Sequence, residues 1–83
     1  MHVQYTAPRN ELERAISVIW QQVLQVEHIG VYDNFFALGG HSLLGMQVVS
    51  AIRQELAFEL PIKSLFTHPT IAGLAGQLEQ EQV

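Results

Sequence analysis

The sequence contains no cysteine among its 83 residues. Neither a disulfide framework nor a thiolate metal site can therefore reinforce the fold. A chain this short buries only about 60% of the surface that it exposes when unfolded. Its stability must come instead from its hydrophobic residues, which make up 48% of the sequence and are ample for one compact domain.

Charged residues are also scarce, at 14% of the chain, which is too few for a typical disordered protein. The net charge of −4 comes from eight acidic residues against four Lys and Arg, so it opposes binding to nucleic acid. No apolar run approaches the roughly 20 residues that a membrane-spanning helix needs. No signal peptide opens the chain. With no targeting feature, we expect a cytoplasmic protein.

The chain does show helical periodicity. After an aperiodic stretch over residues 1–9, Asn10 can cap a helix, and Glu13 stands where a capping box has its acidic residue. Apolar residues then recur at helical spacing, which predicts one buried face with Trp20 as part of the core. This face consists of Leu12, Ile16, Ile19, Trp20, Val23 and Leu24.

A second helix is predicted to begin at Ser42 and to run to about Leu56, with Gly45 allowing the close approach of a neighbour. Its buried stripe comprises Leu44, Val48, Val49, Ile52 and Leu56.

Two further helices are predicted after Leu56. Pro61 suits the first position of a short helix over Ile62–Phe66, and Pro69 ends that helix. Thr70 caps a last helix. The apolar residues of that helix at helical spacing are Ile71, Leu74, Ala75 and Leu78.

No strand alternation and no internal repeat is present. The predicted fold class is therefore all-α, a small four-helix bundle with three longer helices and one short helix. We expect an N-terminal linker or tail over residues 1–9, the folded domain over residues 10–80 and a C-terminal end over residues 81–83.

The segment from Val26 to His41 is a long connection that is expected to be ordered. A long ordered loop in a compact domain is usually functional. Asp33 could cap a brief helical turn through Phe36. The apolar residues that would be costly to leave in water are Ile29, Val31, Phe35, Phe36 and Leu38.

This loop meets the second helix at Gly39, Gly40, His41 and Ser42. The two glycines let the backbone turn sharply and leave the serine hydroxyl unshielded. A phosphodiester on Ser42 would lie at the positive end of the helix dipole, which is worth about 0.3–1 kcal/mol. Because the chain lacks cysteine, a substrate carried as a thioester would need a sulfur supplied from outside, by a cofactor for which we expect a hydroxyl to be the anchor. On these residues alone, the simpler alternative is an ordinary helix cap.

The wider pattern resembles the core motif of peptidyl carrier (thiolation) domains of nonribosomal peptide synthetases, within the phosphopantetheine-binding, acyl-carrier-protein-like family. The matching segment is Asp33-Asn34-Phe35-Phe36-Ala37-Leu38-Gly39-Gly40-His41-Ser42-Leu43. Pro8 to Leu24 is similar to the linker and first helix of the family. Leu60-Pro61 through Thr70-Ile71 is similar to its third and fourth helices. The resemblance covers the chain from about Tyr5 to Leu78.

This resemblance implies that a phosphopantetheinyl transferase uses Mg²⁺ and coenzyme A to attach 4′-phosphopantetheine to Ser42. The thiol of that cofactor would hold an aminoacyl or peptidyl thioester, which an adenylation domain loads and a condensation or thioesterase domain consumes. The chain itself would be a carrier without catalytic residues, and monomeric as an isolated domain. Tyr5 to Arg9 resembles the linker that follows an adenylation domain, so we expect the chain to be part of a larger synthetase.

Four residues around Ser42 are candidates for contact with those partners. Peptidyl carriers tend to have His before the serine, where fatty-acid and polyketide carriers more often have Asp, so His41 favours a peptidyl carrier and a role in partner contact. Met46 and Arg53 follow Ser42 by four and eleven residues, which puts them on its side of the helix. With Leu43 they predict a docking patch. The alternative is that these are scattered surface or edge-of-core residues.

The sequence opposes a metal site and a hydrolase and leaves two other functions open. His2, His28 and His68 do not suggest a metal site. The Gly-X-Ser-X-Gly elbow of hydrolases fails, because Leu44 stands where its second glycine belongs and the elbow needs a sheet. An aryl or acyl carrier and an unmodified helical interaction module remain as alternatives. The amino acid that is carried is chosen by the adenylation domain and is not written in this sequence.

Overall fold

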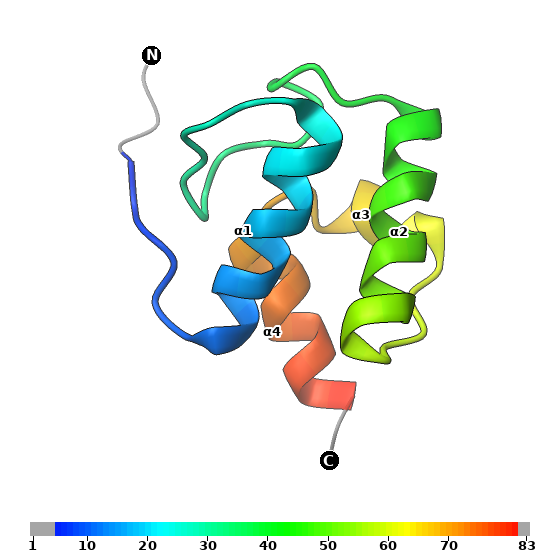
Figure 1. Ribbon diagram of the computed structural model, residues 1–83. Helices are drawn as coiled ribbons and strands as arrows, with labels where there is room; N and C mark the ends of the chain where they lie inside the picture. The colour runs from blue at the N-terminus through cyan, green and yellow to red at the C-terminus, as the bar shows by residue number, and fades with distance from the viewer. Residues whose placement is uncertain (1–4, 82–83) are drawn as a thin grey trace.

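The computed structural model describes residues 5–81, which form four helices and, within that range, no strand (Figure 1). They are α1 (Glu11–Leu24), α2 (Ser42–Leu56), α3 (Ile62–Thr67) and α4 (Ile71–Glu81). Helix α1 packs against α2 and α4, and the short α3 packs against α2 (Figure 1). The predicted all-α bundle with three longer helices and one short helix is confirmed. Within residues 5–81, each helix is too short or too polar to cross a lipid bilayer.

The start of α1 is capped as the sequence predicts, with one difference. The Asn10 side chain accepts a hydrogen bond from the backbone N–H of Glu13 at 2.8 Å. In a capping box, the Glu13 carboxylate would accept from the backbone N–H of the cap residue, Asn10. Here it accepts instead from the residue before, from the backbone N–H of Arg9 at 2.8 Å and from the Arg9 guanidinium at 2.6 Å. The reason for the difference is electrostatic, since hydrogen bonds to a charged guanidinium are stronger than neutral ones.

The later helices start close to the predicted residues. Helix α2 has the predicted bounds. Pro61 is the cap residue of α3 rather than its first helical residue, and α3 ends at Thr67, one residue later than expected. The predicted cap of α4 is confirmed, since the Thr70 hydroxyl accepts from the backbone N–H of Gly73 at 3.0 Å.

The core lies between the three longer helices and includes part of the loop before α2. Trp20 is fully buried, as expected, and its ring forms a T-shaped contact with the ring of Phe35, at a centroid distance of 5.0 Å. The predicted faces of α1 and α4 and the apolar residues of the loop all contribute to the core. Its buried members are Ile16, Ile19, Trp20, Ile29, Val31, Phe35, Val48, Ile52, Leu60, Leu65, Ile71, Leu74, Ala75 and Leu78.

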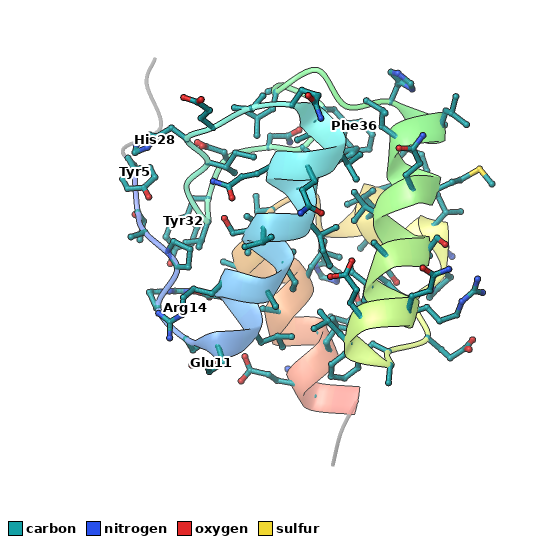
Figure 2. All side chains as sticks on the ribbon, viewed as in Figure 1. Tyr5, Glu11, Arg14, His28, Tyr32 and Phe36 are labelled. Carbon is teal, nitrogen blue, oxygen red and sulfur yellow. The ribbon has the colours of Figure 1, made fainter. Side chains whose placement is uncertain are left out.

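The segment before α1 is in contact with the body of the domain from residue 5 onward. The backbone N–H of Val31 donates to the carbonyl of Thr6 at 2.9 Å. The ring of Tyr5 stacks on His28, with 3.9 Å between the ring centroids. Figure 2 shows these two labelled side chains next to each other at the left of the molecule. Arg9 also donates to the hydroxyl of Tyr32 at 2.8 Å. Residues 1–4 of the predicted linker, with His2, and residues 82–83 of the predicted C-terminal end lie outside the described residues.

The pairing of Arg9 with Glu13 makes the stability of this fold depend on pH. The hydrogen bonds from Arg9 lower the pKa of the Glu13 carboxyl below its ordinary value of 4.5, although burial of that carboxyl acts in the opposite direction. Because the folded state lowers this pKa, the pair stabilises the fold fully above pH 4.5, and its contribution is lost as the pH falls through the folded pKa.

We therefore expect Glu13→Gln to lower the free energy of unfolding by about 1 kcal/mol at pH 7, because a charge-assisted hydrogen bond becomes a neutral one. The difference from wild type should shrink as the pH falls below 4.5. Urea denaturation at a series of pH values measures it. The matched control is Glu11→Gln, whose carboxylate is fully exposed and pairs with Arg14 at 3.4 Å. An equal loss in both variants at pH 7 would contradict the assignment.

Candidate functional site

The loop between α1 and α2 is held in place by backbone hydrogen bonds to the start of α4. The N–H of Phe35 donates to the carbonyl of Pro69 at 2.7 Å, and the carbonyl of Val31 accepts from the N–H of Ala72 at 2.9 Å. Phe35 is fully buried, and its neighbours Phe36 and Leu38 are half-buried. The expectation of an ordered loop is confirmed. The residues that follow it therefore start from a fixed position.

The turn that leads to α2 is capped by Asn34, and the prediction of Asp33 as its cap is wrong. The Asn34 side-chain oxygen accepts from the backbone N–H groups of Phe36 and Ala37, at 2.8 and 3.2 Å. The Asp33 carboxylate instead accepts from the N–H of Gly30 at 2.8 Å and so closes the preceding turn. Both are Asx-type side chains, and only the backbone geometry decides which of two neighbours caps the turn.

Both glycines before α2 are required, for different reasons. Gly39 has a φ of +103°, a backbone conformation that L-residues other than glycine rarely adopt. A Cβ atom on Gly40 would lie 2.3 Å from Cε2 of the Phe35 ring and 2.7 Å from the carbonyl oxygen of Phe35. The chain therefore passes directly over the ring of Phe35 on its way into α2. That close approach sets where α2 begins.

Ser42 is the first residue of α2, and the cap position belongs to His41. The His41 backbone is extended, and its side chain makes no capping hydrogen bond. Ser42 is exposed, and its hydroxyl takes part in none of the hydrogen bonds among residues 5–81. The interpretation of Ser42 as an ordinary helix cap is therefore wrong. The hydroxyl and the first backbone N–H groups of α2 are free to meet a ligand.

A hollow of about 550 Å³ lies beside Ser42, between α2 and α3. Met46 and Arg53 line it, as their spacing from Ser42 predicted, and Met46 is 60% exposed. Leu43 is 62% exposed but is not part of this lining, and neither is His41. The residues that line the hollow are Ser42, Met46, Val49, Ser50, Arg53, Ile62 and Phe66.

Four lining residues were not among the predicted site residues. Val49 was assigned to the buried stripe of α2 and is in fact half-buried, and Ser50 lies beside it. Ile62 and Phe66 come from α3, which has only six residues. A helix of this length is too short for periodicity to show which face is buried. The one available signal was the spacing of Ile62 and Phe66, which puts both on one side of a helix.

Within residues 5–81, the structure shows neither a base hydrogen-bonded to Ser42 nor a cluster of metal-ligating side chains. A serine nucleophile needs a base within hydrogen-bonding reach, and no hydrogen bond joins the side chains of His41 and Ser42. In residues 5–81, no group of three or more His, Cys, Asp or Glu side chains could hold a metal ion. His28 stacks on Tyr5, and the backbone N–H of His68 ends α3 by donating to Ser64 at 2.8 Å.

Comparison with known proteins identifies relatives of the whole folded part. A family model described as "Phosphopantetheine attachment site" matches residues 14–78. Surfactin synthase subunit 1 of Bacillus subtilis (strain 168) is 51% identical over 78 residues, which are 94% of this chain and 2% of that protein. The chain thus spans about 2% of the length of this curated relative.

Two solved structures are also similar. The complex of the phosphopantetheine transferase Sfp with coenzyme A and a peptidyl carrier protein matches with a TM-score of 0.88 and 45% identity, over 92% of this chain and 99% of that chain. McyG A-PCP complexed with phenylalanyl-adenylate matches with a TM-score of 0.86 and 39% identity, over 90% of this chain and 12% of that chain.

The glycines give a prediction about how the start of α2 is fixed. We expect Gly40→Ala to lower the free energy of unfolding by about 1–3 kcal/mol, because its methyl group would overlap the ring of Phe35. Gly39→Ala should cost about 1 kcal/mol or more through its positive φ alone, since nothing lies within 4 Å of its Cβ position.

The control is Gly76→Ala in α4, where a Cβ atom also meets nothing within 4 Å and φ is not positive. This variant should gain about 0.5–1 kcal/mol, because alanine favours a helix. Urea denaturation measures all three variants. A Gly40→Ala protein as stable as wild type would show that the chain does not need this close approach.

Proposed function

This chain belongs to the family of phosphopantetheine attachment domains, and we propose that Ser42 is the residue to which the phosphopantetheine is attached. The observation that carries the proposal is the exposed Ser42 hydroxyl, which makes no hydrogen bond within residues 5–81 and stands at the first residue of α2. The other serines differ in this respect. Ser17 and Ser64 are buried, and Ser50 is half-buried in the hollow.

The surroundings of Ser42 fit the group that the family carries. A phosphodiester on this hydroxyl is an anion at a helix N-terminus, beside backbone N–H groups that no side chain caps. The interaction is worth about 0.3–1 kcal/mol at an exposed site. It orients the base of a long arm without burying it. When bound, the group supplies the thiol that the cysteine-free chain lacks, on which an aminoacyl or peptidyl group is held as a thioester.

The domain is a carrier, and the catalytic groups come from its partners. A phosphopantetheinyl transferase attaches the group from coenzyme A. The similarity to the peptidyl carrier protein solved with such a transferase supports this partner. An adenylation domain loads the carrier, and the likeness to a structure complexed with an aminoacyl-adenylate supports that step. Condensation and thioesterase domains are proposed to act last on the loaded carrier, because a thioester is a reactive acyl donor that another enzyme must consume. The relatives are synthases many times longer than this chain, so we propose that it works as part of a nonribosomal peptide synthetase.

The partners are proposed to contact the surface around Ser42. Met46 and Arg53 line the hollow beside it, and Leu43, which directly follows Ser42 and is largely exposed, is proposed to belong to the same contact surface. His41 is exposed at the cap position, next to the attachment residue. Methionine adapts its shape to different partners, which suits a surface that several enzymes contact in turn.

The first test is attachment itself. Incubation with coenzyme A and a transferase of broad specificity should raise the intact mass by one phosphopantetheine, and Ser42→Ala should abolish the gain. Ser42→Ala should change the free energy of unfolding by less than about 0.5 kcal/mol, because the side chain is exposed and unbonded.

The matched control for attachment is Ser50→Ala, which alters another serine of the same hollow and should still be modified. A folded wild-type protein that gains no mass with an active transferase contradicts the proposal. So does a Ser42→Ala protein that is still modified.

The second test concerns the docking surface. Met46→Glu introduces a charge that must be desolvated when a partner covers the hollow. We expect it to raise the apparent KM of the transferase for the carrier by about tenfold, equivalent to about 1.4 kcal/mol. Steady-state kinetics with varied carrier concentration measure this change.

The matched control for docking is Gln80→Glu, which adds the same charge at an exposed position of α4, on a different helix from Met46 and Leu43 and outside the hollow. It should change KM by less than about twofold, the effect of a peripheral charge. Equal effects of the two variants would mean that net charge, rather than this hollow, governs the encounter.

A further inference from the structure

Two aromatic rings join the loop before α2 to the short helix α3. Phe36 belongs to that loop (Figure 2), and Phe66 belongs to α3. Their rings are nearly parallel, with an interplanar angle of 6° and a centroid distance of 5.2 Å. Phe66 is also one of the residues that line the hollow beside Ser42, and it is 50% exposed. The stack therefore connects the two segments that flank Ser42.

Helix α3 needs such contacts to hold its position. It has six residues, and an isolated helix of that length is not stable in water. Its inner face is held by the buried Leu65 and by a hydrogen bond from the Gln77 amide to the Ser64 hydroxyl at 3.0 Å. Its outer face, which includes Phe66, is held by the ring of Phe36.

Phe36 is itself held by two contacts outside α3. Its backbone N–H donates to the Asn34 side chain at 2.8 Å, which holds the turn. Its ring meets Phe35 edge-on at a centroid distance of 5.3 Å, and Phe35 meets Trp20 in the core. A continuous series of ring contacts thus runs from Trp20 to Phe66, from the centre of the bundle to the hollow.

We infer that Phe36 is a positioning residue, which holds Phe66 and α3 where they frame the surface beside Ser42. This inference rests on the proposed attachment at Ser42 and names a residue that acts on it through another. Phe36 does not line the hollow. Its effect is to present the transferase with a preformed surface, so that α3 does not have to be ordered during binding.

The test uses Phe36→Leu, which keeps an apolar side chain and removes the ring. We expect the apparent KM of the transferase for this variant to rise by about 2- to 10-fold, the factor that loss of one aromatic pair implies. The kcat should change by less than about twofold, because the reacting groups are untouched. Two amide hydrogens report on α3: that of Ser64, which donates to the carbonyl of Pro61, and that of His68, which donates to the carbonyl of Ser64. NMR hydrogen exchange should show both exchanging faster in Phe36→Leu than in wild type. The exchange rates of amide hydrogens in α1 and α4, after correction for the change in global stability, should not increase.

Two further variants make the outcome decisive. Phe36→Tyr retains the stack and should restore both KM and the exchange of the α3 amides. Phe58→Leu changes another half-buried phenylalanine, one with no ring partner among residues 5–81, and should leave KM unchanged. An unchanged KM for Phe36→Leu, or faster exchange spread equally over all helices, overturns the inference. If the wild-type protein itself is not modified, the proposed function fails instead, and the exchange data still report whether Phe36 holds α3.

Discussion

The ring of Phe35 is the contact on which the geometry of this domain depends. It packs against Trp20 on one side, and the chain crosses it at Gly40 so closely that a single added carbon would overlap it. The same ring lies 3.9 Å from the position that a Cβ atom added to Gly45, the fourth residue of α2, would occupy. One side chain thus lies against the end of the loop, the start of α2 and the first turn of α2 that packs on α3. Because protein interiors are close-packed and do not deform freely, this contact determines where Ser42 emerges.

The residues that build the fold and the residue proposed to carry the cofactor are different sets. The loop before α2 is held by backbone hydrogen bonds and by the side chain of Asn34, and the core is held by the aromatic rings. The Ser42 hydroxyl takes part in none of these contacts within residues 5–81. A serine one position earlier would be at the cap of α2, where its oxygen would be drawn into the helix. At the first helical position the hydroxyl remains available. Under the proposed function, this separation would let Ser42 be modified without loss of a contact that stabilises the fold.

Much of this could be predicted from the sequence, because the determinants are local. Periodic apolar residues located the three longer helices, and Pro61 and Pro69 marked the ends of the short one. Asn10 and Thr70 were correctly identified as caps. The sequence could not show whether Asp33 or Asn34 caps the turn, or whether His41 or Ser42 occupies the cap position of α2. Which of two neighbouring residues is the cap depends on backbone angles, and tertiary contacts set those angles. The contribution of α3 to the hollow was missed for a related reason. A six-residue helix has too few turns for its pattern to say which side is covered.

The burial of Trp20 has a spectroscopic consequence. It is the single tryptophan of the chain, it is fully buried, and its indole N–H has no hydrogen-bond partner within the described residues. Its fluorescence therefore reports on one apolar environment, at the inner end of the ring contacts that lead to the hollow. Loss of the core moves that emission to longer wavelength, while chemistry on the exposed rim at Ser42 leaves the indole in the same surroundings. The protein thus carries an intrinsic optical probe of its folding that is independent of its cargo.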